Sequence, residues 1–469
     1  MGLRCPVVSL VRAFALICIF GAMESTLVDA ETMVQSSRPV TSECRIQAVD
    51  YKGWDAQQLS NQWVQLMVVP QNGGRLMQVS FAGHSYLFVN RKYAGKYLPP
   101  TPGKWFNYGG DKLWLLPEGN NDEQHWAGGS DIVDDGPYSF RKISEGQECG
   151  IELTGPSDPQ TGVQFVRTIG LHADSPRIRF DASMKNVTGH TIEWSMQSVS
   201  QYDTSESGAQ SKINRNFWTF TPANKASSYL NRYHVRFGPA ENPAASVRDD
   251  GLFALHYVHI AAELWLDSTD GWLAVVDANT QYAMVERFRY EENKSYPGKA
   301  SVIFWTNGRE IKLNADGEAA LSEGEDEQLP YYLEAELNSP LCRLNPGEAC
   351  SMQTDWFPTR VGEEFHGVTD AGIVTRPLQA TRLHNGQIKL SGSFGVFFPG
   401  RLVAHFYDAH GSGLGNTPVA DVNPSDLASL AVELTPSGNP TRVSLHLEDG
   451  KGLDRGSLQE IRVSSGENR

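Results

Sequence analysis

Apolar and polar residues alternate along most of the chain in short runs, and turn residues separate these runs about every 8 to 15 positions. The runs are rich in β-branched and aromatic residues, as in VQFVRTIGL at 163–171, GWLAVVDA at 271–278 and YAMVERFRY at 282–290. A period of two is the pattern of a half-buried strand. No long stretch repeats with a helical period, so the chain is predicted to be all-β.

The strongest helix candidate is NPSDLASLAVEL at 423–434, where Asn423 is placed to cap and Pro424 to occupy the first helical position. Turn residues and the alternating run RVSLHL at 442–447 follow directly. A single turn that leads into a strand therefore fits this segment equally well.

The composition changes near residues 358 to 378, between the strand-like YYLEAEL region and a new series of short alternating runs. We expect a first β domain over residues 40–362 and a second over residues 372–465. The strand spacing of the second domain is that of a small β-sandwich module.

The first 30 residues have the layout of a signal peptide. Arg4 and Arg12 precede or begin an apolar run from 13 to 22, and small residues follow near position 30. The run is short for a membrane span, so we expect an exported protein, periplasmic or secreted, with no membrane association once residues 1–30 are removed.

The formal charge of −15 and the pI near 5.3 argue against nucleic acid or an anionic membrane as a partner. A neutral or cationic ligand agrees better with this charge. The chain has no GxSxG, Walker-type or HExxH sequence and no cysteine pair with the spacing of a zinc site outside the expected disulfides. We therefore expect no cofactor and no metal.

Four cysteines remain after the signal peptide, and an oxidising compartment favours disulfides between them. Cys342 and Cys350 flank a turn sequence, LNPG at 344–347, which favours their pairing. Cys44 and Cys149 then pair by elimination. Four free buried thiols are the alternative.

The segment 105–126, WFNYGGDKLWLLPEGNNDEQHW, combines three tryptophans with a Gly-Gly pair and several ionisable side chains. Aromatic faces stack on pyranose rings, and carboxylates, lysine and histidine hydrogen-bond hydroxyls or transfer protons. A sugar is therefore the expected ligand. In the alternative interpretation, Trp105 and Trp114 are core residues, and Asp111 forms a structural ion pair with Lys112.

The order of four segments resembles the galactose-mutarotase-like β-supersandwich, and in particular an exported branch that carries a GGDKLW sequence. These segments are NGGRLMQVSFAGHSYLFVN at 72–90, YGGDKLWLLPE at 108–118, DDGPYSF at 134–140 and the long run YYLEAELNSPLCRLNPGEACSMQTDWFPTR at 331–360. The resemblance covers roughly residues 45 to 360. It implies a supersandwich followed by the small β-sandwich module.

The aldose 1-epimerases of this superfamily open the sugar ring with a late glutamate as base and a histidine as acid. The resemblance places Glu334 at the position of the late glutamate, and Glu336 projects from the same strand face. Two carboxylates in one desolvated site raise the pKa of one of them. The alternative is that both face solvent on an edge strand.

The histidine departs from the family pattern, because the corresponding region reads SMQSVSQYDTSESG at 195–208 and contains none. His125, next to Trp126, is the candidate for the acid. His256 and His259 are further candidates, although alternation makes His259 fit a core position better.

The predicted site combines these groups. The catalytic candidates are Glu334, Glu336 and His125, and the substrate-binding candidates are Arg75, Asp111, Lys112, Trp114, Glu118 and Trp126. Alternation places Lys112 and Trp114 on one strand face, so a sugar can stack on Trp114 with Lys112 at its edge.

The sequence thus predicts an exported carbohydrate-binding protein, with aldose-epimerase-like acid/base activity as one interpretation. A non-catalytic sugar-binding or structural module is the second interpretation. A polysaccharide lyase or glycoside hydrolase accessory protein is the third.

Overall fold

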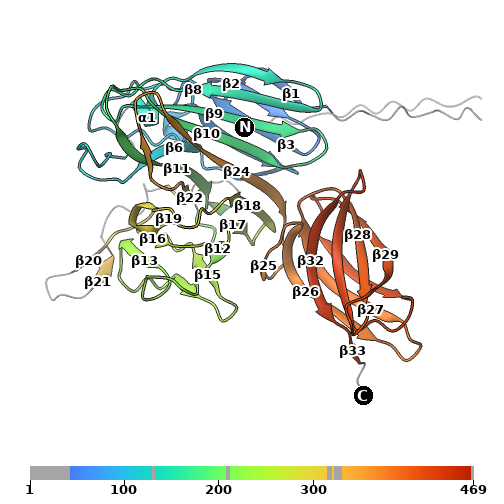
Figure 1. Ribbon diagram of the computed structural model, residues 1–469. Coiled ribbons are helices and arrows are strands. Elements are labelled where there is room, and N and C mark those ends of the chain that lie inside the picture. Colours follow the sequence, from blue (N-terminus) through green and yellow to red (C-terminus); the bar gives the residue numbers. More distant parts are fainter. Residues whose placement is uncertain (1–42, 129–131, 207–211, 314–318, 322–329, 466–469) are drawn as a thin grey trace, which may run out of the picture. The chain divides into compact units, whose positions relative to one another are not determined.

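The computed structural model describes residues 43–465 except 129–131, 207–211, 314–318 and 322–329 (Figure 1). The predicted signal peptide, residues 1–30, lies outside the described residues. In the part that is described, nearly all regular structure is strand, and helix is limited to short turns such as α1 (Ile132–Asp135), η1 (Arg91–Tyr93) and η3 (Pro297–Lys299). The prediction of an all-β chain is confirmed.

The first large sheet contains twelve strands and carries most of the predicted site residues. In spatial order, its main path is β1 (Arg45–Tyr51), β2 (Trp54–Ser60), β3 (Val64–Val69), β4 (Arg75–Phe81), β6 (Asp111–Leu116), β11 (Ile192–Asp203), β22 (Tyr332–Asn338), β19 (Val302–Thr306), β16 (Ala262–Leu266) and β13 (His234–Phe237). The short strands β5 (His84–Ser85) and β23 (Cys342–Leu344) pair with β4 and β11.

The second large sheet contains ten strands. Its order is β14 (Ala245–Val247), β15 (Leu252–His256), β12 (Phe217–Pro222), β17 (Trp272–Asp277), β18 (Tyr282–Phe288), β24 (Ala349–Arg360), β10 (Ile178–Asn186), β9 (Val163–His172), β8 (Glu148–Thr154) and β7 (Ser139–Ser144). Neighbouring strands in both large sheets are antiparallel, which agrees with their one-face-buried alternation.

The core lies between these two sheets. Leu66 and Leu115 from the first sheet belong to one continuous apolar cluster with Phe165 and Trp356 from the second. The strand β9 shows why, because its residues alternate strictly between buried and half-buried positions along all ten residues. Sequence alternation therefore fixes which face of each strand enters the core.

The C-terminal region forms a smaller sandwich of two sheets. One sheet contains β25 (Gly367–Val368), β26 (Gly372–Arg382), β27 (Ile388–Val396), β30 (Ala428–Leu434) and β33 (Ser464–Ser465); the other contains β29 (Gly413–Val422), β28 (Gly400–Tyr407), β31 (Arg442–Asp449) and β32 (Asp454–Arg462). A separate two-stranded ribbon, β20 (Ile311–Leu313) with β21 (Ala319–Leu321), completes the described strands.

One apolar cluster joins the inside of this smaller sandwich to residues of the ten-stranded sheet. The rings of Phe357 in β24 and Phe397 after β27 stack with centroids 4.6 Å apart. The sheets themselves are separate, since β24 ends at Arg360 and β25 begins at Gly367. The boundaries 40–362 and 372–465 stay a proposal.

The helix candidate at 423–434 forms a turn and then a strand. The side chain of Asn423 accepts a hydrogen bond from the backbone of Ser425 at 2.8 Å, and β30 begins at Ala428. Side-chain hydrogen bonding to a nearby backbone N–H stabilises turns at the expense of helices. Pairing of β30 with β27 then determines the extended conformation.

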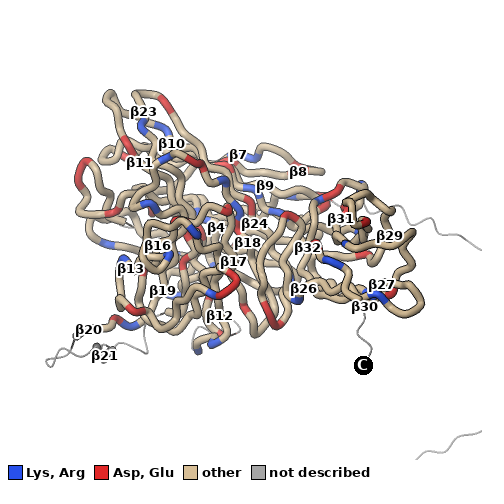
Figure 2. The backbone as a smooth tube through the Cα atoms, turned by 60° about the horizontal axis from the view of Figure 1, so that its bottom comes forward, with Lys and Arg blue, Asp and Glu red and all other residues tan. Residues whose placement is uncertain are grey.

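Both predicted disulfides are present, Cys44 with Cys149 and Cys342 with Cys350, with Cα separations of 5.4 and 6.5 Å. Disulfide-bonded cysteines agree with an exported protein. Figure 2 shows acidic and basic residues interspersed along the described backbone. In that same part of the chain, no helix is both long and apolar enough to cross a membrane.

Candidate functional site

The candidate site lies on the face of the twelve-stranded sheet that points away from the core. In β6, Leu113 and Leu115 belong to the main core, whereas Leu116 packs with Ile303 and Trp265 on the opposite face. Lys112 and Trp114 share that opposite face because side chains alternate along a strand. We call it the site face.

Strand register places the polar groups of the site face in two adjacent rows. In one row, Gln201, Glu334, Trp305 and Glu263 are direct partners across β11, β22, β19 and β16. In the next row, Lys112, Val199, Glu336, Ile303 and Trp265 are partners across β6, β11, β22, β19 and β16. Neighbouring strands lie about 4.8 Å apart, so the rows form one continuous surface.

Lys112 and Glu334 form the ion pair at the centre of this surface. Lys112 Nζ lies 3.3 Å from Glu334 Oε1 and 4.4 Å from the Trp114 ring centroid, and the Lys112 side chain is buried. Gln201 Nε2 donates to Glu334 Oε1 at 2.6 Å, and Gln197 Nε2 donates to Glu336 Oε2. Since β22 lies between β11 and β19, the alternative of two solvent-facing carboxylates on an edge strand is wrong.

Three glutamates on or next to this face have a raised pKa. Burial raises the pKa of Glu336 well above the ordinary glutamate range, and repulsion from Glu334 adds to the rise. Burial also raises the pKa of Glu263, which accepts from Trp265 Nε1 at 2.5 Å. A carboxyl group that keeps its proton near neutral pH can serve as a general acid.

Glu118, just after β6, belongs to the same electrostatic group. Crowding by protein atoms raises the pKa of Glu118 to about 8, and repulsion from Glu263 and Glu334 adds to the shift. The residue is nevertheless exposed, so solvent screens part of that repulsion. Glu118 is thus a carboxyl group that a ligand can reach, whereas Glu334 and Glu336 are nearly fully buried. We call these two glutamates, together with Gln197 and Gln201 that donate to them, the floor of the site face.

Aromatic side chains surround these carboxylates. Trp105 is 42% exposed and its ring meets that of Trp114 edge to face, at 6.4 Å. Phe237 from β13, 41% exposed, stacks on Trp305 at 5.5 Å. Trp105 therefore is not a core residue, and the partly exposed rings supply the flat apolar surfaces on which sugars stack.

Trp114 is supported from within the protein. Its Nε1 donates to Asp134 Oδ1 at 2.7 Å, and Arg75 Nη2 donates to the same oxygen at 2.7 Å. Asp135 next to it is also buried, and desolvation with repulsion from Asp134 raises its pKa to about 8. The predicted ligand group Arg75 is fully buried in this network and holds α1 and Trp114 instead of lining the site face.

The other predicted binding residues divide between the site face and the interior. Asp111 points into the core, where it pairs with Arg167 from the opposite sheet and accepts from Ser200 at 3.1 Å. It does not pair with Lys112, so the structural ion pair between neighbours is wrong. Trp126 is buried and its ring packs edge to face on Trp114 at 5.5 Å.

The side chain of His125 contacts Asp122 and not Glu334 or Glu336. Its ring Nδ1 lies 2.8 Å from Asp122 Oδ1, and its side chain is 43% exposed. His256 belongs to β15 in the other sheet, where it stacks on Trp218 at 4.3 Å. The segment 195–208 contains no histidine, and its Gln201 contacts Glu334.

Glu263, Trp265 and Trp305 were not predicted as site residues. Each follows the alternating pattern of its strand, AELWL at 262–266 and VIFWT at 302–306, and those strands read as ordinary core strands. A carboxylate two residues before a tryptophan on one strand face was the available signal. The pairing of β16 and β19 next to β22, which local sequence does not specify, brings these residues to the site face.

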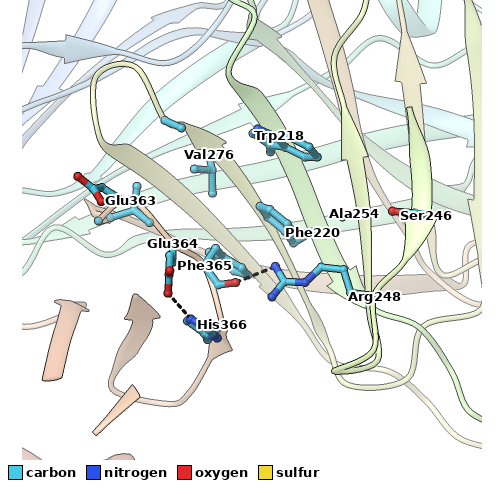
Figure 3. A pocket seen from close by; sticks show the side chains of 13 residues that line it. Trp218, Phe220, Ser246, Arg248, Ala254, Val276, Glu363, Glu364, Phe365 and His366 are labelled. Carbon is cyan, nitrogen blue, oxygen red and sulfur yellow. Dashed lines mark hydrogen bonds and ion pairs between the residues drawn. The ribbon is translucent and has the colours of Figure 1, made fainter. Parts of the chain in front are cut away.

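A cavity of about 590 Å³ lies against β12, β15 and β17 and the segment 361–366 (Figure 3). Phe220 and Phe365 stack there at 4.3 Å, and Arg248 Nη1 donates to the Phe365 carbonyl at 2.8 Å. His366 pairs with Glu364 at 2.8 Å. Arg248, Glu364 and His366 of this cavity already contact one another or the backbone, so we place the candidate site on the site face.

No protein-family model matches this chain, and no curated protein is found to be similar. Solved structures are similar at low identity. A protein of Synechocystis sp. PCC 6803 is 12% identical over 67% of this chain and 99% of its own, with a TM-score of 0.43. A putative mutarotase from Salmonella typhimurium is 10% identical over 67% of this chain and 94% of its own, with a TM-score of 0.44.

A galactose mutarotase-like protein from Clostridium acetobutylicum is 9% identical over 68% of this chain and 99% of its own, with a TM-score of 0.43. Two of these three neighbours, from Salmonella typhimurium and Clostridium acetobutylicum, are described as a putative mutarotase and a galactose mutarotase-like protein. At such identities the likeness concerns the fold alone.

Proposed function

We propose that the protein is an exported carbohydrate-binding protein whose site face also carries the acid and base groups needed to interconvert the anomers of an aldose. The observation that carries this proposal is the Lys112–Glu334 ion pair beside a second buried glutamate, Glu336, under partly exposed tryptophans. Loops and strand faces with a few convergent polar groups among aromatic side chains are typical of small-molecule sites.

The acid/base chemistry follows from the two glutamates. Glu334, paired with Lys112, takes the proton of the anomeric hydroxyl, while Glu336 donates its proton to the ring oxygen. The bond from the anomeric carbon to the ring oxygen then breaks and gives the open aldehyde. Rotation about the adjacent carbon–carbon bond and reversal of both proton transfers closes the other anomer.

Aromatic stacking supplies the binding energy for the neutral ring. A sugar that stacks on Trp114 or Trp105 buries one apolar face and leaves its hydroxyls at the edge, near Glu118 and the floor carboxylates. Preorganised charged groups in a partly desolvated site also stabilise charge that develops during ring opening.

A non-catalytic sugar-binding module is the second candidate, and one observation favours it. Gln201, from the segment 195–208 that lacks the histidine expected from the resemblance, donates to Glu334, and a side-chain amide does not serve as a general acid or base near neutral pH. In this case the site face binds a carbohydrate and has no turnover.

The test is to measure, by polarimetry, the rate at which the anomers of common aldoses interconvert in the presence of the mature protein and of its Glu334→Gln variant. We expect a rate above the spontaneous one, and a loss of at least about 100-fold in turnover for the variant, as is typical when a general base is removed. Glu433→Gln, an exposed glutamate in β30, serves as the matched control. Equal rates with and without the wild-type protein exclude the mutarotase activity and leave the binding module.

A further inference from the structure

The site face carries more carboxyl groups than cationic groups. Its glutamates are Glu118, Glu263, Glu334 and Glu336, and its cations are Lys112 and Arg236, with His234 at its β13 edge. Lys112 already contacts Glu334 and the Trp114 ring. Arg236 lies exposed at the rim, 5.9 Å from the Trp265 ring. Carboxyl groups thus outnumber the cations that face them.

Buried acceptors that lack a donor also favour a ligand that donates hydrogen bonds. Gln197 and Gln201 are at least nine-tenths buried, and each uses its amide N–H to donate to a glutamate of the floor. Among the described residues, none donates to Gln197 Oε1, Gln201 Oε1 or Asn338 Oδ1. The floor is therefore rich in acceptors and poor in donors, and a complementary ligand is one that brings donors.

The aromatic rings favour a cation as well. Two cations of the protein itself, Lys112 and Arg236, lie over tryptophan rings of this face. An ammonium group over a tryptophan face is attracted by the ring quadrupole, and the attraction grows when the site is desolvated.

Resting on the proposed carbohydrate-binding function, we infer that the site face selects amino sugars: the pyranose ring stacks on the tryptophans, and the ammonium group binds among the glutamates. An ammonium has three donors and no acceptor, which matches the acceptor-rich floor. A carboxylate-bearing sugar such as a uronic acid adds an acceptor and a negative charge, so the same face rejects it.

The protons on the glutamates provide a second readout. Burial and repulsion between carboxylates raise the pKa of Glu118 and of Glu336, so both groups favour the protonated form more than an ordinary glutamate does. An ammonium group favours the ionised form of each carboxyl group that it contacts and lowers its pKa. Binding of an amino sugar should therefore be accompanied by proton release, which binding of the uncharged N-acetyl analogue should not produce.

The experiment is isothermal titration of the mature protein at pH 6.5 with glucosamine, galactosamine and mannosamine, each compared with its N-acetyl derivative, and with glucuronic acid. Two buffers of different ionisation enthalpy report the proton count. We expect at least one amine to bind about tenfold or more tightly than its N-acetyl partner, with proton release, and glucuronic acid to bind weakest. Glu118→Gln should reduce the discrimination and the proton release together, and Glu433→Gln should change neither.

The outcomes separate the two ideas. Binding of the N-acetyl derivatives as tight as that of the amines, without proton release, overturns the selection of amino sugars and leaves the carbohydrate-binding function standing. Absence of binding for every sugar of the panel overturns both. A preference for amines that Glu118→Gln leaves intact shows that the acceptors of the floor, not Glu118, select the ammonium group, and contradicts the proton-release argument.

Discussion

Removal of the positive charge at the centre of the site face should destabilise the protein strongly. Lys112→Met leaves Glu334 with its negative charge and without its cation, in a place where both side chains are nearly fully buried. At the 3.3 Å separation and an effective dielectric constant of about 20, the lost attraction is on the order of 5 kcal/mol. Measured losses for half of a buried pair are about 3 to 5 kcal/mol.

The assay is urea denaturation at pH 7.5. The double variant Lys112→Met with Glu334→Gln, in which neither group is charged, should recover much of the loss at pH 7.5. Arg141→Met, which breaks the exposed pair with Glu152, is the control and should cost less than about 1 kcal/mol.

Two results refute this reasoning. One is a loss for Lys112→Met that is no larger than the loss for the exposed control Arg141→Met. The other is a double variant whose loss equals the sum of the two single losses, because that shows no coupling between the groups.

Three further predictions concern the core and the support of the site. Glu286 is buried, and desolvation raises its pKa from 4.5 to about 8, so the folded state binds more protons than the unfolded state between these values. Stability therefore falls as the pH rises through this range, and Glu286→Gln should flatten the fall in urea denaturation at pH 5, 6.5 and 8. An unchanged dependence of stability on pH in the variant contradicts the raised pKa of Glu286. Replacing Cys44 and Cys149 with alanines should lower the free energy of unfolding by about 4 to 5 kcal/mol, and replacing Cys342 and Cys350 should lower it by about 2 to 3 kcal/mol, because the first disulfide closes the longer loop. The reverse order in urea denaturation would show that strain or residual structure dominates. Asp134→Ala removes the acceptor of the Trp114 indole N–H and should weaken sugar binding severalfold. Asp134→Asn keeps an acceptor oxygen and should bind sugar more nearly as wild type does. Equal sugar titration curves for the two variants contradict a role of Asp134 in positioning Trp114.

The fold class followed from the sequence because strand periodicity is a local property. Alternation in VQFVRTIGLH gave both the existence of β9 and its buried face. Local pattern also placed Lys112 and Trp114 on one face of β6. The segment 423–434 shows the limit, since its residues suit a helix and its pairing with β27 makes it a strand.

The site was predicted only in part because it depends on which strands become neighbours. Glu334 and Glu336 came from the family resemblance; in the structure Glu334 contacts Lys112, and Glu336 lies in the same row as Lys112 with Val199 between them. Glu263 was missed because β16 reaches the site through β19, a pairing between segments about 40 residues apart. Arg75 looked like a ligand group at a turn, and the partner that buries it, Asp134, lies 59 residues later in the chain.

The central claim is that the site face binds a carbohydrate, and sugar titration of the mature protein against Trp114→Ala tests it most directly. Trp218→Ala, which removes a partly buried tryptophan of the cavity beside residues 361–366, is the matched control. We expect wild type and Trp218→Ala to bind the same sugars of a broad glycan panel with similar affinity, and Trp114→Ala to lose about tenfold or more, the loss of one stacking surface. Binding that survives Trp114→Ala unchanged, or the absence of any bound glycan for the wild-type protein, would contradict the account.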